Sequence, residues 1–359
     1  MSWKSLAIVL IVYAVPLSAQ QSPARTVSLE GTDGVPRIVN GTLNQRALNG
    51  SLTSVMGDIA RSTDAKVWAG YAIPAAMLKP DLFSHSDCCS ECSLEFQSHR
   101  YFNSDKLPVG VASPNLFVFV RSERGQVTRV RHLNSACSID AAGATVQWLT
   151  GVSPGESISY LLSLVTADTA RNISSDAIAT IAFHADPAAD VALEKLVSPG
   201  QPRPLREQAA FWIAAEGGSH ALDVLRKLAR EDTDEGFRKS VTFPLSVIPG
   251  DAGVQDLIRM AHDDPAPGVR GQALFWMAQK AGARIASEIA ASLDNDPDTE
   301  VKKRAVFALS QIPNGNGIPK LIEVARTHSN RAVRQQAVFW LGQSRDVRAL
   351  SFIEDILTH

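Results

Sequence analysis

The stretch VRQQAVFWLG, residues 333–342, contains the pattern that decides most of the fold. Variants of it recur upstream at a spacing of 32 residues, and each begins with an apolar residue followed by a cation. These pairs are Leu205-Arg206, Phe237-Arg238, Val269-Arg270, Val301-Lys302 and Val333-Arg334. A period of this length is typical of solenoids, in which each repeat buries its apolar side against the next.

Three further positions of each copy follow the same period. A small residue stands four after the start, a phenylalanine six after it and an aliphatic residue eight after it. The small residues are Ala209, Val241, Ala273, Ala305 and Ala337; the aromatic ones are Phe211, Phe243, Phe275, Phe307 and Phe339; the aliphatic ones are Ile213, Leu245, Met277, Leu309 and Leu341. Small and aliphatic residues four apart share one face of a helix, so each copy predicts a helix that packs closely on its neighbours.

A second helix is expected after a turn in every copy, because an aliphatic residue recurs there with the same period. These residues are Leu225, Leu257, Ile289, Leu321 and Ile353. A weaker copy without the aromatic residue begins at Ile173 and resembles an N-terminal capping unit. We therefore expect residues 169–359 to form an all-α solenoid of about six helical hairpins.

These residues also carry a family resemblance. The pattern V-R-x-x-A-x-x-x-L-G, together with the turns at Asp264-Pro265 and Asp296-Pro297, resembles the bacterial HEAT repeats of the phycobilin-lyase type. The resemblance implies a HEAT-repeat solenoid, but this scaffold serves many unrelated tasks.

Two enzyme families share this scaffold, and neither activity is expected here. Deoxyhypusine hydroxylases have similar arrays and hold iron with His-Glu pairs, yet none of the eight histidines in this chain is followed by Glu. Phycobilin lyases have a similar repeat pattern, but their substrates lie in the cytoplasm or plastid, where an exported chain would not meet them.

Residues 1–19 predict that the chain is exported. Lys4 precedes the apolar run Leu6–Val15, and the small-residue segment Pro16–Ala19 predicts cleavage before Gln20. The alternative is an uncleaved anchor, although the run is much shorter than the roughly 20 residues that cross a bilayer. The expected location is secreted or periplasmic, with no membrane span after cleavage.

Between the signal and the solenoid, residues 20–168 predict a β-rich α+β module. Residues 52–61 have the apolar spacing of a short helix, and residues 67–74 form a strand that ends at proline. Residues 116–120 and 127–131 are β-branched and aromatic runs joined by a Gly-containing turn, which predicts a hairpin. A further strand is expected at 145–149, followed by a short helix from Gly155.

The four cysteines of the chain belong to this module. They are Cys88, Cys89, Cys92 and Cys137. An even number in an oxidising compartment predicts disulfides, with the pairing left open. Two alternatives remain, a zinc site or a thiol-redox pair. Cys89 and Cys92 have the C-x-x-C spacing of a zinc site, and Cys137 with Cys88, His85, His99 or His132 could complete the set.

Two periodic features of the solenoid are candidates for a partner surface. The cations Arg206, Arg238, Arg270, Lys302 and Arg334 could bind an acidic ligand, or each could pair with an acidic residue of the adjoining turn. Trp212, Trp276 and Trp340 share one position of alternate copies, with Pro244 and Ala308 between them. They could form a recognition stripe or pack between helical layers.

The positions of the histidines and the overall charge argue against a metal site in the array and against nucleic-acid binding. His184, His220, His262 and His328 fall at four different positions of their copies, and we interpret them as isolated surface residues. The formal charge of -2 lacks the cationic excess that nucleic-acid binding requires. The sequence therefore predicts an exported scaffold that binds a protein partner, without catalysis and without a cofactor. The alternative is a metal-dependent or thiol-redox enzyme or sensor centred on the cysteines.

Overall fold

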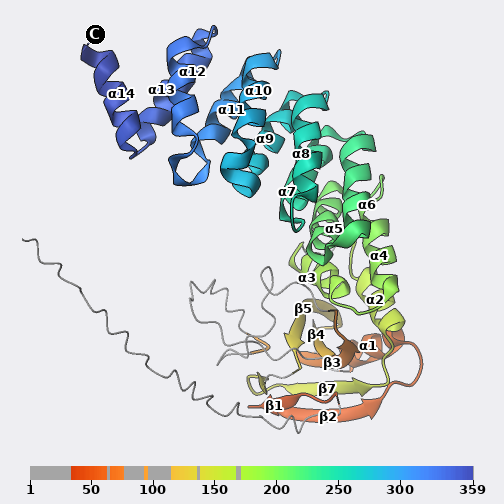
Figure 1. The fold of residues 1–359 in the computed structure, drawn as a ribbon. Coiled ribbons are helices and arrows are strands. Elements are labelled where there is room, and N and C mark those ends of the chain that lie inside the picture. The colour runs from red at the N-terminus through yellow and green to blue at the C-terminus, as the bar shows by residue number, and fades with distance from the viewer. Residues whose placement is uncertain are drawn as a thin grey trace, which may run out of the picture.

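The computed structural model describes residues 34–62, 65–76, 93–95, 115–135, 138–166 and 171–358 (Figure 1). The predicted signal segment and all four cysteines lie outside these residues. Within the described residues, an N-terminal α+β module is followed by an array of helices, as the sequence predicts.

The module is built on a mixed sheet. Five of the described strands follow the order β2-β7-β3-β4-β5, in which β2, β7 and β3 run parallel and β3, β4 and β5 run antiparallel. Two short strands, β1 and β6, pair beside it. The bounds are β1 Arg37–Val39, β2 Thr42–Ala47, β3 Val67–Pro74, β4 Asn115–Glu123, β5 Gln126–Asn134, β6 Ser138–Asp140 and β7 Thr145–Thr150. The predicted hairpin is β4–β5, and the predicted strands at 67–74 and 145–149 are β3 and β7.

Two helices with side-chain caps join the sheet. The helix α1 (Leu52–Arg61) begins after Ser51, whose hydroxyl accepts the backbone N–H of Ser54. The helix α2 (Pro154–Ser163) begins with a capping box, in which Ser153 and Glu156 each accept the other's backbone N–H. Both helices contribute apolar residues to the core on one face of the sheet. The opposite face holds a second core around Trp68, Phe117, Phe119 and Trp148.

The array consists of paired helices, which we call the first and second helix of each unit. The first helices α5, α7, α9, α11 and α13 begin at Arg203, Glu235, Pro267, Thr299 and Arg331. The pairs in the described chain are α3 Arg171–Ala182 with α4 Pro187–Val197; α5 Arg203–Glu216 with α6 Gly218–Glu231; α7 Glu235–Val247 with α8 Ala252–Asp263; α9 Pro267–Ala281 with α10 Ala286–Asn295; α11 Thr299–Ser310 with α12 Ile318–Thr327; and α13 Arg331–Gln343 with α14 Val347–Thr358. Short 3-10 turns lie at Gly282–Ile285 and Pro313–Gly315.

The array bends, and the first helices line the inner side of the bend. Neighbouring first helices lie closer together than neighbouring second helices do. In Figure 1, α5, α7 and α9 accordingly lie inside the curve, and α6, α8 and α10 lie outside it. We call the surface of the first helices the inner face. A solenoid presents an extended surface on such a face.

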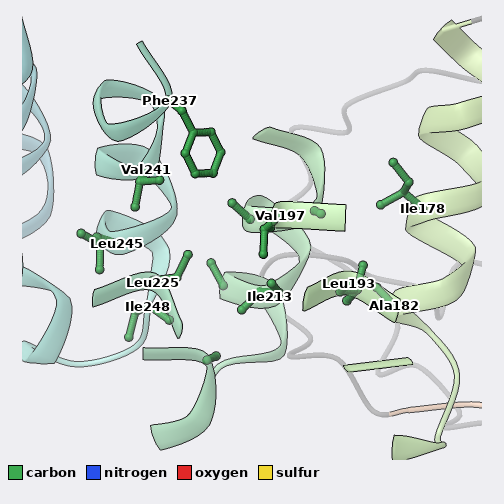
Figure 2. Packing of buried hydrophobic residues seen from close by; sticks show 14 of the residues in the cluster. Ile178, Ala182, Leu193, Val197, Ile213, Leu225, Phe237, Val241, Leu245 and Ile248 are labelled. Atoms are coloured by element: carbon green, nitrogen blue, oxygen red, sulfur yellow. The ribbon is translucent and has the colours of Figure 1, made fainter. Parts of the chain in front are cut away.

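One hydrophobic core runs from the sheet into the array. The cluster extends from Ile178 and Leu193, in α3 and α4, through Ile213 and Leu225 to Leu245 in α7 (Figure 2). Burial of each such side chain stabilises the fold by roughly 1.5–3 kcal/mol. No helix in the described part of the chain is long and apolar enough to cross a membrane.

Backbone hydrogen bonds also fix the joint between module and array. The N–H of Ala76 donates to the Phe183 carbonyl at 2.8 Å, and the N–H of Ala185 donates to the Pro74 carbonyl at 3.1 Å. The residues after α3 thus extend the end of β3. Because the core and these bonds are continuous, the module closes the N-terminal end of the array.

Candidate functional site

Three of the periodic arginines are buried in ion pairs. Arg238 donates to both carboxylate oxygens of Asp264, at 2.8 and 3.0 Å, and Arg270 donates to both oxygens of Asp296, at 2.7 and 3.0 Å. Arg206 contacts Asp232 in the same way. Each arginine lies in a first helix, and its aspartate lies just after the second helix of the same unit. We call these three pairs the Arg–Asp rungs.

Each rung also satisfies the backbone of the turns. Arg238 donates to the Asp232 carbonyl at 2.8 Å, and Arg270 donates to the Asp264 carbonyl at 2.9 Å, so each guanidinium spans two successive turns. Hydrogen bonds to its aspartate are the first cause of the raised pKa of Arg238, and Arg270 shows the same effect. The rungs therefore tie one unit to the next as part of the scaffold.

For Arg206, Arg238 and Arg270 the structure shows the second of the two interpretations, in which each cation pairs with an acidic residue of the adjoining turn. The acidic-ligand interpretation is wrong for these three. Their side chains are buried and engaged, so they offer no charge to a partner. The two other cations donate to carbonyls. Lys302 donates to the Asp294 carbonyl in the last turn of α10 at 2.9 Å, and Arg334 donates to the carbonyls of His328 and Ser329.

A series of aromatic rings follows the inner face. We call it the aromatic ladder; its members are Phe211, Trp212, Phe243, Phe275, Trp276, Phe307, Phe339 and Trp340. Every ring touches another, with centroids between 4.7 and 5.8 Å apart. At its N-terminal end, Trp212 touches Phe183, which touches His132 of the module.

The ring contacts between neighbouring units alternate between two kinds. Phe211 stacks on Phe243 at 5.7 Å and 5°, and Phe275 stacks on Phe307 at 5.8 Å and 2°. Between these stacks, Phe243 meets Trp276 at 4.7 Å in a tilted arrangement. The parallel stacks form where the tryptophan position of the next unit holds Pro244 or Ala308. The ladder thus repeats every two units. The tryptophans pack between neighbouring units and also border the inner face.

The absence of a tryptophan at position 244 coincides with a groove. The groove has a volume of about 600 Å³ and lies across α5, α7 and α9. Its apolar lining includes Phe211, Phe243, Pro244 and Trp276, and its polar lining includes Lys239 and Gln272. Phe243 is 36% exposed, and further along the ladder Phe339 is 53% exposed. The sequence indicated the tryptophans as candidates for a partner surface. Trp276 does line the groove, but the groove lies where the tryptophan position holds Pro244.

Charges at the groove are partly neutralised. Arg203 lies within ion-pair distance of Glu207 and Asp234. Lys239, in contrast, has no carboxylate partner among the residues described. The groove therefore combines aromatic side chains with an uncompensated cation.

A buried polar chain lies at the joint. The Nε2 of His184 is 2.8 Å from the Ser157 hydroxyl, which lies 2.9 Å from the Tyr71 hydroxyl. The Nδ1 of His184 is 2.9 Å from the Thr180 carbonyl, which only accepts, so Nδ1 carries the proton and Nε2 accepts from Ser157. Burial lowers the pKa of His184 to about 4. The surface interpretation of His184 is therefore wrong. The contact resembles a Ser–His dyad, but Ser157 is 0% exposed and unavailable to a substrate.

An acidic pair lies between α4 and α5. Burial, a hydrogen bond to Asp190 and the charge of Asp190 raise the pKa of Glu216 to about 8. Nearby, His220 lies 2.8 Å from Glu194. Within the described ranges, no group of three or more His, Cys, Asp or Glu residues could hold a metal ion. The cysteine site, whether disulfide, zinc or redox, falls outside those ranges, and of its proposed partners His132 lies 3.0 Å from the Thr180 hydroxyl.

Comparisons with known proteins identify the class of repeat. A family model described as HEAT repeats matches residues 286–359. Together with the stacked hairpins, this match shows that the chain contains HEAT repeats. A search of curated proteins gave no match.

Several solved structures resemble the chain weakly. The complex of CpcE and CpcF of phycocyanin lyase from Nostoc is 18% identical, with a TM-score of 0.29, over 53% of this chain and 76% of that one. Human deoxyhypusine hydroxylase is 16% identical, with a TM-score of 0.25, over 56% of this chain and 77% of that one. Kap121p bound to Pho4p is 11% identical, with a TM-score of 0.37, over 52% of this chain and 23% of that one. Likeness at this level carries no argument about activity or partners.

Proposed function

We propose that this protein is an exported interaction scaffold that binds a protein partner on the inner face of its helical array. The observation that carries the proposal is the groove between α5, α7 and α9, where the aromatic ladder is partly open to solvent. Aromatic side chains supply large contact area at low entropic cost, which is why they are enriched in protein interfaces. The array supports the groove with one continuous core, so the binding surface is preorganised.

The test compares two exposed apolar residues. Phe243→Ser removes a ring from the groove, whereas Val191→Ser changes a residue of α4 that is 68% exposed and lies outside the groove. Each purified chain is immobilised and incubated with the exported proteins of the source organism, and retained proteins are quantified by mass spectrometry. We expect a partner that the wild type and Val191→Ser retain and that Phe243→Ser loses. Equal retention by all three chains would contradict the proposal.

Export and the cysteines are tested by intact mass. In protein recovered from an oxidising compartment, we expect a chain that begins at Gln20, with each disulfide lowering the mass by two hydrogens relative to the reduced chain. A full-length chain would contradict cleavage before Gln20 and favour the uncleaved anchor. Four free thiols holding one zinc would favour the metal alternative at Cys88, Cys89, Cys92 and Cys137.

A further inference from the structure

The two-unit period of the ladder places a second aromatic site along the inner face. Advancing by 64 residues maps Phe211, Phe243 and Trp276 of the groove onto Phe275, Phe307 and Trp340. Both ring contacts recur nearly unchanged: the parallel stack has centroids 5.7 Å apart in one case and 5.8 Å in the other, and the tilted pair 4.7 and 4.8 Å. The inner face therefore offers two related anchor points, two units apart.

The distance between these sites fits an extended chain. Packed helices lie about 8–10 Å apart, so two units span roughly 16–20 Å. An extended chain rises about 3.3 Å per residue, which gives about five or six residues for that span. Alternate side chains of a strand point the same way, so two anchors on one face need an even separation. Six residues is the even number that fits.

Each of the two sites has a cation without a carboxylate partner among the described residues. At the first site, Lys239 lacks a carboxylate partner among the described residues. At the second site, the equivalent Lys303 pairs with Glu300, but Arg304 has no carboxylate partner within the described part of the chain. The side chain of Arg304 lies across Gly271, in the space that a Cβ there would need. The Arg304 side chain therefore lies between α9 and α11, the helices that contain Phe275 and Phe307.

We infer that the inner face binds an extended, acidic protein segment that inserts two apolar side chains, six residues apart, at the two aromatic sites. This inference rests on the proposed function and specifies its partner. The first anchor enters the groove beside Phe243, the second packs near Phe307, and acidic residues of the segment meet Lys239 and Arg304.

Synthetic peptides provide the test. Three fluorescent peptides of about twelve residues are titrated with the full mature chain, and binding is followed by anisotropy. The first has two Phe six residues apart among Glu and Ser; the second has the Phe three apart; the third keeps the spacing of six and replaces Glu by Lys. We expect the first to bind about tenfold more tightly than either of the others. Equal binding of the second or third peptide would overturn the inference.

Reversing the charge of the two cations tests whether they contact the acidic residues of the peptide. Lys239→Glu combined with Arg304→Glu should weaken binding of the acidic peptide about tenfold and strengthen binding of the Lys peptide. Lys227→Glu, on the second helix α6, makes a charge change of the same kind away from the groove and should leave both affinities unchanged. An equal effect of the two charge changes would show general electrostatics in place of a site.

The inference and the proposed function can fail separately. If none of the three peptides binds, but a partner is still retained by the wild type and lost by Phe243→Ser, the inner face binds a protein of another kind and only the inference fails. If every partner is retained by Phe243→Ser, both fail.

Discussion

The arginines of the Arg–Asp rungs and the phenylalanines of the aromatic ladder lie on first helices and recur every 32 residues, but they have different environments. Arg270 is 8% exposed and lies among hydrogen bonds, whereas Phe243, a ladder residue, is 36% exposed and borders a groove. In the sequence both looked like periodic candidates for a partner surface. A residue that recurs in every unit is one that the packing of each unit requires. A place where the period is broken, as at Pro244, is a better indication of a binding site.

Breaking a rung should have the largest effect on stability. Arg270→Ala leaves Asp296 buried without its cation, and we expect the free energy of unfolding to fall by about 3–5 kcal/mol. Urea denaturation followed by circular dichroism measures this loss.

The control is an exposed pair with similar donor–acceptor distances. Arg284 donates to both oxygens of Asp251 at 2.8 and 3.0 Å, close to the distances in the Arg270 rung, but this pair lies in solvent. We expect no measurable change from Arg284→Ala. Equal losses in the two variants would mean that burial is not what distinguishes the rungs.

The second prediction concerns the buried polar chain at the joint, which has no ion pair. The folded pKa of His184 is lowered to about 4 by burial, below its ordinary value of 6.5. Between these values the unfolded chain binds a proton that the folded chain does not. Stability should therefore fall by about 3 kcal/mol as the pH drops from about 6.5 to about 4, and change little from this source above 6.5.

Two variants isolate this effect from other titrating groups. His184→Gln should lack this part of the pH dependence when its unfolding curves are compared with those of the wild type. Tyr71→Phe shortens the same polar chain but keeps His184, so it should retain the wild-type slope. A His184→Gln profile parallel to the wild type would contradict the prediction.

A third prediction installs a rung where the fifth unit lacks one. Lys302 and His328 stand at the positions that Arg270 and Asp296 occupy one unit earlier. The Nδ1 of His328 accepts the Asn330 N–H at 3.0 Å, as the Asp296 carboxylate accepts that of Asp298. We expect Lys302→Arg with His328→Asp to stabilise the chain by about 1 kcal/mol, measured by urea denaturation. Lys302→Arg alone should give no gain, and a loss of stability in the double variant would show that the turn after α12 cannot accept a rung.

The smallest effect on stability is expected at the groove cation. Lys239→Gln removes a charge that has no carboxylate partner among the described residues, so the thermal midpoint should be unchanged. Binding of the acidic peptide should nevertheless weaken. A marked loss of stability would place Lys239 with the rungs and outside the binding surface.

Much of the array could be predicted from sequence because its helices depend on local spacing. The apolar positions around Ala337 and Leu341 require one buried helix face, and the hairpin at β4–β5 follows from two β-branched runs with a short turn. The groove could not be predicted in this way. It depends on how Phe211, Pro244 and Trp276, from three successive units, meet across helix interfaces.

The role of the periodic cations could not be predicted from the sequence either. An arginine that follows the first apolar residue of each repeat gives the same sequence pattern whether its guanidinium faces solvent or a turn. The decisive partner of Arg270 lies 26 residues away, at Asp296. His184 was misread because its partners, Ser157 and Tyr71, belong to the module, and the period of the array contains no information about them.

Two glycines follow the same two-unit alternation as the rings. A Cβ on Gly253 would meet the Leu245 carbonyl oxygen at 2.0 Å, and one on Gly317 would meet that of Leu309 at 1.9 Å. These close approaches occur in the units that hold Pro244 and Ala308. Excision of one hairpin would bring two units of the same kind together and mismatch both rings and backbone. The array should therefore tolerate shortening or lengthening in steps of two hairpins better than in steps of one. Two consecutive hairpins are thus the unit to add or remove in engineering.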